Sequence, residues 1–210
     1  MKLLVGPKPI ALFLVGTTSL VACWQAYQYR EYAANMPPKT SVDPKEVLAV
    51  STDIRGASIP KYVLVEFGDY QCPPCAHAAP TVLALLKKYP SDLGFVFRNM
   101  PLSIHPLSRQ AASIAMACRY DHWRVHDELY SYGAKLSPEI LKRIQDAHKI
   151  KPADMKLAEE NVALDESVSK DFNANSTPSF FLLSCAGSKA QVFGPASLDQ
   201  VDWVVNHHAS

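Results

Sequence analysis

The feature that most constrains this chain is a pair of cysteines between a strand-like run and a helix-like run. Cys72-Pro73-Pro74-Cys75 follows the apolar, β-branched run Tyr62–Phe67 and precedes Ala76–Tyr89, whose apolar residues recur at helical spacing. Two thiols at this spacing can close a small disulfide and open it again. A thiolate at a helix N-terminus is stabilised by the helix dipole and by free amide groups. The motif therefore predicts a redox dithiol where a strand leads into a helix.

Half of a zinc site has the same cysteine spacing. A structural zinc ion needs four ligands, and the sequence has no second pair of cysteines or histidines at zinc-ligand spacing. His122 and His126 are four residues apart on a predicted helix, but they lack a third ligand, so we expect them to pack rather than to bind metal. A redox pair is thus favoured over a structural or metal-binding pair.

Composition excludes other classes of protein. With 210 residues, 48% hydrophobic and 20% charged, the chain can form one domain with a sizeable core. A net charge of +1, without basic runs interleaved with aromatic residues, gives no indication of a nucleic-acid partner. Five cysteines are too few for a disulfide scaffold.

The N-terminus has the pattern of an export signal. Lys2 and Lys8 precede the uncharged apolar run Ile10–Trp24, which is short for a spanning helix of roughly 20 residues. The run ends in Leu20-Val21-Ala22-Cys23, which resembles a bacterial lipobox, in which the cysteine (here Cys23) is lipidated. The alternatives are an uncleaved membrane anchor and an ordinary cleaved signal. All three place the domain outside the cytoplasm, where disulfides persist.

The chain is therefore divided into three parts. Residues 1–23 are assigned to an export signal, lipobox or membrane anchor, and residues 24–45 to a polar tether. Residues 46–210 form the folded domain, in which a helical insertion spans about residues 104–172.

Periodicity within the domain predicts a βαβ unit, a helical block and a ββα unit. A strand at 46–52 and a turn at 53–58 are expected before the first long strand. The other expected strands are 62–68, 93–97, 179–183 and 190–193, and the expected helices are 73–89, with Pro73 at its first position, 108–119, 122–132, one from 138, one from 152 and one after Ser197. Strand, helix and strand in succession favour parallel pairing of the strands at 62–68 and 93–97.

This order resembles the thioredoxin fold, an α/β fold, and more closely its DsbA-like branch, in which helices are inserted between the two halves. The resemblance runs from about Glu46 to Val205. It is carried by four ordered stretches, which are Val65–Cys75, Phe97–Leu102 followed by His105-Pro106, Trp123–Asp127, and Ser176–Phe181.

The resemblance implies roles for particular residues. Cys72 would be the nucleophile at the helix N-cap and Cys75 the buried resolving thiol. Glu66 matches a buried acid beneath the resolving cysteine that relays a proton; the alternative is an edge residue that reaches solvent. Thr177-Pro178 matches a cis-proline that faces the disulfide and leaves backbone groups free for an extended substrate; the alternative is an ordinary proline at a strand start.

Cys118 and Cys185 are the remaining pair in the domain. Some exported relatives carry a second, structural disulfide in this region, which makes a bridge between these two residues one expectation. The alternative is two unconnected core thiols, because spacing alone does not establish disulfide geometry.

The expected function is that of an extracytoplasmic, membrane-tethered thiol–disulfide oxidoreductase that needs no metal or organic cofactor. Its expected partners are exported cysteine-containing proteins, with a membrane quinone-linked oxidase that restores the disulfide. The first alternative is a disulfide reductase or isomerase fed by a membrane electron carrier. The second, of a different class, is a copper- or zinc-binding lipoprotein that uses Cys72 and Cys75 as soft ligands.

Pro74 bears on the redox direction. A thiolate at the N-cap normally accepts hydrogen bonds from the second and third helical amides, and Pro74 has no amide hydrogen, which leaves Cys75 as the only donor of that pair. No histidine lies between the cysteines to add a cation. We therefore expect a disulfide less oxidising than that of DsbA.

Overall fold

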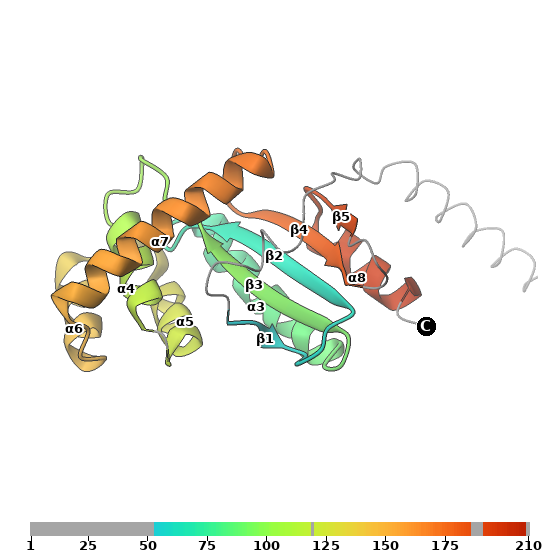
Figure 1. Ribbon diagram of the computed structural model, residues 1–210, viewed down its shortest axis with the longest axis horizontal. Coiled ribbons are helices and arrows are strands. Elements are labelled where there is room, and N and C mark those ends of the chain that lie inside the picture. Colours follow the sequence, from blue (N-terminus) through green and yellow to red (C-terminus); the bar gives the residue numbers. More distant parts are fainter. Residues whose placement is uncertain (1–52, 119, 186–190, 209–210) are drawn as a thin grey trace, which may run out of the picture. The chain divides into compact units, whose positions relative to one another are not determined.

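The computed structural model describes residues 53–118, 120–185 and 191–208. Within these ranges lies a five-stranded mixed sheet in the order β1-β3-β2-β4-β5 (Figure 1). β2 and β3 are parallel, and the other neighbouring strands are antiparallel. The strands are β1 Arg55–Gly56, β2 Tyr62–Gly68, β3 Leu93–Asn99, β4 Ser179–Ser184 and β5 Gln191–Phe193.

The helices follow the predicted order. One helix joins β2 to β3, the predicted helical block lies between β3 and β4, and one helix follows β5. They are α3 Pro73–Lys88, α4 Ser108–Ala117, α5 His122–Tyr132, the short 3₁₀ helix η1 Gly133–Lys135, α6 Pro138–Ala147, α7 Pro152–Asp171 and α8 Leu198–His208.

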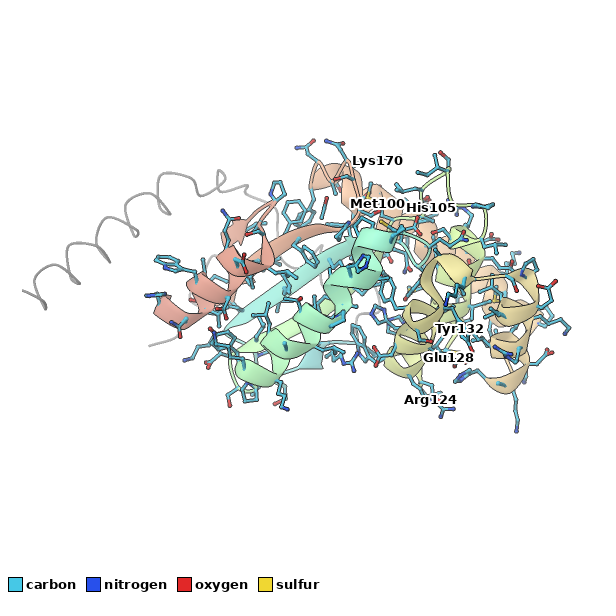
Figure 2. All side chains as sticks on the ribbon, turned by 180° about the vertical axis from the view of Figure 1, so that it is seen from behind. Met100, His105, Arg124, Glu128, Tyr132 and Lys170 are labelled. Atoms are coloured by element: carbon cyan, nitrogen blue, oxygen red, sulfur yellow. The ribbon has the colours of Figure 1, made fainter. Side chains whose placement is uncertain are left out.

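β2 is buried on both faces, as its nearly continuous apolar run predicts. Alternate side chains point to opposite faces of the sheet. Phe67 packs with Phe172 and Phe181 at ring-centroid distances of 5.3 and 5.8 Å, in a core next to the C-terminal end of α7. Figure 1 shows the sheet in front of α3, and Figure 2 shows α3 in front of the sheet. Glu66 points away from the Phe67 core and lies on the face of the sheet that α3 covers.

The prediction of a turn alone at 53–58 was wrong. The expected turn at 53–58 contains β1, which pairs with β3 through Arg55 and Phe95. Gly56 can occupy this edge because it adopts φ +103°, and a Cβ there would lie 2.6 Å from the Leu93 carbonyl oxygen. The strand expected at 46–52 lies outside the described residues.

The buried stripe of α3 differs from the predicted one. The helical spacing of the apolar residues predicts a face made of Ala76, Ala79, Val82, Leu83 and Leu86, but Leu83 is 40% exposed and Leu85 is buried instead. The helix begins at Pro73, which places Cys75 on the inward face, and the stripe continues from there through Val82. Tertiary packing thus rotated the buried face relative to the local pattern.

The predictions for residues 1–23 and 24–45, including lipidation of Cys23, lie outside the described residues. Among the helices that the structure describes, none is both long enough and apolar enough to cross a bilayer.

Candidate active site

Cys72 occupies the N-cap of α3 in an extended conformation, with Pro73 and Pro74 as the first two helical residues, as predicted. Its amide donates to the Asp69 carbonyl at 3.1 Å, which fixes the turn that leads from β2 into the helix. The sulfur makes no capping hydrogen bond, contrary to the expected contact with the Cys75 amide. As a thiol, it instead donates to the Thr177 carbonyl at 3.3 Å.

Cys75 lies one turn further into α3 and has no exposed surface, whereas Cys72 retains 4%. Both thiols are free, so the structure describes the reduced dithiol, with the Cys72 sulfur in hydrogen-bond reach of Cys75. Burial, followed by the charge of Glu66, raises the pKa of Cys75 far above its ordinary value. A thiolate formed at Cys75 would therefore take up a proton readily, and Cys72 is the sulfur more open to a substrate.

Thr177-Pro178 is in the cis form, as the family resemblance implied. It directly precedes β4, which pairs with β2 on the side opposite β3. The Thr177 carbonyl faces the Cys72 sulfur, and the Thr177 hydroxyl oxygen is buried without a partner among the described residues. The cis peptide therefore borders the dithiol, next to the sulfur that a substrate would reach.

Glu66 is 1% exposed, which excludes the alternative of an edge residue in contact with solvent. It pairs with Phe97 of β3 and Phe180 of β4, so apolar rings flank it on both sides. Burial raises its pKa from 4.5 to about 8. The carboxyl therefore exchanges its proton near neutral pH, within the electrostatic reach of Cys75.

A hydrogen-bond network that the sequence did not reveal joins two loops at the dithiol. The buried Asp69 carboxylate accepts from the amides of Gln71 and Leu102 at 2.7 and 2.8 Å, and lies 2.8 Å from His105 Nδ1. Gln71 Oε1 accepts from the Leu107 amide at 2.6 Å. Figure 2 shows His105 near the N-terminal end of α3. The network ties the loop after β3 to the segment that presents Cys72.

His126 and Trp123 pack, as expected from the matching motif. His126 Nδ1 lies 3.0 Å from the Tyr70 hydroxyl, and burial holds the pKa of His126 well below its ordinary value. Its ring contacts Phe97 edge-on at 4.7 Å between centroids. His122 Nδ1 faces the Ala115 carbonyl at 3.1 Å. Both imidazoles are therefore engaged within the protein, in an aromatic cluster between α5 and the sheet.

The predicted bridge between Cys118 and Cys185 is absent, and both are free thiols. Cys118 caps the C-terminal end of α4, and its pKa is raised by burial and then by the charges of acids in the helical block, the largest from Asp121. Cys185 follows β4, and its amide donates to the Lys61 carbonyl at the start of β2. Because β2 and β4 are antiparallel, this is the end of the sheet away from the dithiol. The two thiols are therefore unconnected, but only Cys118 is buried as the alternative of core thiols expected, whereas Cys185 is exposed.

Metal ligation has little support in the described part of the chain. No group of three or more histidine, cysteine, aspartate or glutamate side chains gathers there in a way that would hold an ion. Cys72 and Cys75 by themselves offer two sulfurs next to a carbonyl and a buried acid. This arrangement suits reversible disulfide chemistry.

A family model described as Thioredoxin matches residues 49–184, more than half of the chain. The chain belongs to the thioredoxin family. Cys72 and Cys75 lie at the start of α3, beside a cis X-Pro bond. The resemblance to this family implied the same arrangement.

Solved structures confirm the DsbA-like form of the thioredoxin fold. A periplasmic thioredoxin-like protein from Salmonella enterica serovar Typhimurium aligns with a TM-score of 0.64 and 22% identity, over 81% of this chain and 100% of that one. The thiol-disulfide exchange protein alpha-DsbA2 from Wolbachia pipientis gives 0.61 and 18%, over 80% and 91%. The catalytic domain of Proteus mirabilis ScsC gives 0.62 and 18%, over 79% and 97%.

The curated relatives of this thioredoxin-family chain are much longer proteins. A Na⁺/H⁺ antiporter, NhaA 1 of Salinispora arenicola, is 34% identical over 91 residues, which are 42% of this chain and 14% of the antiporter. NhaA 1 of Mycobacterium sp. strain KMS is 24% identical over 187 residues, 82% of this chain and 30% of the antiporter. The chain thus spans less than a third of these two relatives.

Proposed function

We propose that this chain is an extracytoplasmic thiol–disulfide oxidoreductase that oxidises exported cysteine-containing proteins. The observation that carries the proposal is the position of Cys72. It caps α3, faces the cis Thr177-Pro178 peptide, and lies one helical turn from a fully buried Cys75 beside Glu66. These groups supply a nucleophile, a resolving thiol and a proton donor.

The first step is attack by a substrate thiolate on Cys72 Sγ of the oxidised protein. The bond between the Cys72 and Cys75 sulfurs breaks, Cys75 leaves with the electron pair, and a mixed disulfide forms at Cys72. Glu66, protonated below a pKa of about 8, gives its proton to the Cys75 thiolate, whose pKa is strongly raised. Glu66 is then reprotonated from solution, which balances the proton that the attacking thiol lost.

In the second step, the second thiolate of the substrate attacks the substrate sulfur that is bonded to Cys72 in the mixed disulfide. The substrate disulfide forms, and Cys72 leaves with the electron pair. Two substrate thiols have then become one disulfide, and the protein holds the reduced dithiol that the structure describes. The chemistry requires no metal or organic cofactor, but it does require an oxidant to restore the disulfide, which we propose to be a quinone-linked membrane enzyme.

The same steps run backwards in a reductase or isomerase, and the reduction potential distinguishes the two directions. Pro74 at the second helical position removes an amide donor near Cys72, which favours a potential between those of thioredoxin and DsbA. We expect roughly −230 to −150 mV, against about −270 mV for thioredoxin and −120 mV for DsbA. A value at or below that of thioredoxin, from equilibration with glutathione, would support the reductase.

The compartment is proposed from the N-terminal pattern. Lys2, Lys8 and the apolar run that ends in Leu20-Val21-Ala22-Cys23 indicate export and a tether to the membrane. One of the structurally similar proteins, the thioredoxin-like protein of Salmonella enterica serovar Typhimurium, is periplasmic, which is consistent with that location. Mass spectrometry of the mature N-terminus tests it: acylated Cys23 supports a lipoprotein, and an intact Met1 supports an uncleaved anchor.

Trapping of substrates tests the assigned roles. Cys75→Ser keeps the nucleophile and removes the resolver, so mixed disulfides with exported proteins should accumulate through Cys72. Cys72→Ser is the matched control and should trap none. Trapping through Cys75 in that control would reverse the roles. Stoichiometric binding of copper or zinc by the reduced protein, without disulfide exchange, would instead support a metal-binding lipoprotein.

A further inference from the structure

Besides the Thr177 hydroxyl, two further buried polar atoms near the dithiol lack a hydrogen-bond partner among the described residues. They are Glu66 Oε1 and the hydroxyl oxygen of Tyr130 on α5. Glu66 is 1% exposed and Tyr130 8%. Buried polar groups nearly always have partners, and an exception in a native structure calls for an explanation. One such atom is the proposed proton donor, and the other belongs to a residue to which sequence reasoning gave no role.

The ring of Phe97 brings the two groups into one cluster. Glu66 pairs with Phe97 across β2 and β3, and a Cβ at Gly68 would lie 2.9 Å from Glu66 Oε1 and 2.3 Å from Phe97 Cε2. Tyr130 packs edge-on against the same Phe97 ring at 5.9 Å between centroids, and Tyr70 lies 5.0 Å from Tyr130. The carboxyl and the hydroxyl thus lie on one face of the sheet, against a shared aromatic wall.

The charges around Tyr130 fix its protonation. Burial raises the pKa of Tyr130 well above its ordinary value, and the charges of Glu66, Cys75, Tyr70 and Asp69, in that order, raise it further. All four are acids. The Tyr130 hydroxyl therefore keeps its proton throughout the range in which Glu66 titrates, and it can act as a hydrogen-bond donor there.

Neighbouring polar groups do not take this role. The Tyr70 hydroxyl is already engaged with His126 Nδ1 at 3.0 Å. His126 is neutral because burial lowers its pKa, so it adds no positive charge to the cluster. When Glu66 loses its proton, the Tyr130 hydroxyl is a buried donor against the Phe97 ring that has no other partner among the described residues.

We propose that Tyr130 is a positioning residue that stabilises Glu66 in its ionised form. As the dithiol is reduced, the Cys75 thiolate takes the proton of Glu66, and the Tyr130 hydroxyl, keeping its own proton, donates a hydrogen bond to the carboxylate left behind. Tyr130 thereby lowers the pKa of Glu66 toward the pH at which disulfide exchange occurs. The inference rests on the proposed function, in which Glu66 exchanges a proton with Cys75.

The test is the titration of Glu66 in the reduced protein without substrate. The carbonyl stretch of its protonated carboxyl is followed by infrared difference spectroscopy against pH, with Glu66→Gln as the blank. Tyr130→Phe should move the midpoint upward by about one pH unit, the scale of one hydrogen bond to a charged group. Tyr132→Phe is the matched control on α5 (Figure 2), since its hydroxyl accepts from Arg143, and it should match wild type.

An unchanged midpoint in Tyr130→Phe would overturn the proposal. Should that variant not fold, the test uses carbon-13 NMR of the tyrosine Cζ atoms. The protein is then Tyr70→Phe, so that the neighbouring Tyr70 does not contribute a second resonance to that of Tyr130. One resonance should then move over the Glu66 range and stop moving when Glu66→Gln is added, and the absence of a moving resonance would reject the contact. Because no substrate is present, a protein that shows the shift but exchanges no disulfides rejects the proposed function and retains the contact.

Discussion

Glu66 and Asp165 are both 1% exposed, yet their surroundings differ. Asp165 on α7 accepts hydrogen bonds from Arg98 Nη1 at 2.8 Å and from the amide and side chain of Asn99 at 2.9 Å. Glu66 Oε1 has no partner among the described residues. The two acids lie on opposite faces of the sheet, because Glu66 pairs with Phe97 and the next residue, Arg98, points the other way.

This difference separates a structural carboxylate from a chemical one. Burial raises the pKa of both acids, but at Asp165 the charge of Arg98 and the donors of Asn99 oppose the rise. At Glu66 nothing comparable opposes it, and the pKa reaches about 8. Asp165 thus fastens α7 to the end of β3, whereas Glu66 is able to exchange a proton near neutral pH.

The largest expected effect is the loss of unfolding free energy when the structural carboxylate, Asp165, is replaced. Asp165→Asn removes the charge that buried Arg98 contacts, and breaking such a pair costs about 3–5 kcal/mol of unfolding free energy. The reduction potential of the folded fraction should stay at the wild-type value. Urea unfolding measures the first quantity and glutathione equilibration the second. The control on the same helix is Glu166→Gln, whose partially exposed pair with Arg109 is worth less than about 1 kcal/mol. A changed reduction potential in Asp165→Asn would contradict the distinction between a structural Asp165 and a proton-exchanging Glu66.

Glu66→Gln should act through pH. Because the folded pKa is about 8 and the unfolded value 4.5, the folded protein binds this proton more tightly. Its contribution to stability is full below pH 4.5, falls as pH rises from 4.5 to 8, and is gone above 8. Glu66→Gln should remove that fall and make the protein about 2–3 kcal/mol more stable than wild type at pH 9, after the cost of a buried amide. Urea unfolding at pH 5 and pH 9 tests this. The same change in unfolding free energy between the two pH values in both proteins would contradict it.

Gly68→Ala tests how closely the Glu66 carboxyl is confined. A Cβ would lie 2.3 Å from Phe97 Cε2 and 2.9 Å from Glu66 Oε1, so the ring or the carboxyl must shift. Overpacking of this kind costs about 1–3 kcal/mol. Ala112→Gly, on α4, is a control for backbone effects and should cost about 1 kcal/mol without altering the Glu66 titration. Wild-type stability together with an unmoved titration in Gly68→Ala would show that the carboxyl is loosely held.

The smallest effect is expected at the other end of the dithiol. Pro74→His restores an amide donor near Cys72 and adds a possible cation, which should stabilise the thiolate by about 1 kcal/mol and raise the reduction potential by about 20 mV. Pro74→Ala separates the two contributions, since it restores the amide alone. A lower potential in both variants would mean that Pro74 does not restrain the oxidising power of this site.

Much of the fold and part of the site could be predicted from the sequence. The apolar run at β2, the helix signal after Cys72 and the hairpin at β4 and β5 are local patterns, and the order of elements follows from them. The cis form of Thr177-Pro178 was implied by the family resemblance and is confirmed. A bridge between Cys118 and Cys185 was one of two alternatives and does not form, and the choice could not be made from the sequence because spacing along the chain does not tell where two elements end in space.

The dithiol, the helix cap that presents it and the succession of strands and helices follow from the sequence alone. These features depend on the conformational preferences of neighbouring residues, which are written locally in the chain. Three further contacts become evident only in the folded chain: Asp69 pairs with His105, Arg98 pairs with Asp165, and Tyr130 packs against the Phe97 ring next to Glu66. Such contacts join residues far apart in the chain, and which of them form depends on how the packed elements exclude water and leave each buried polar group a partner or none.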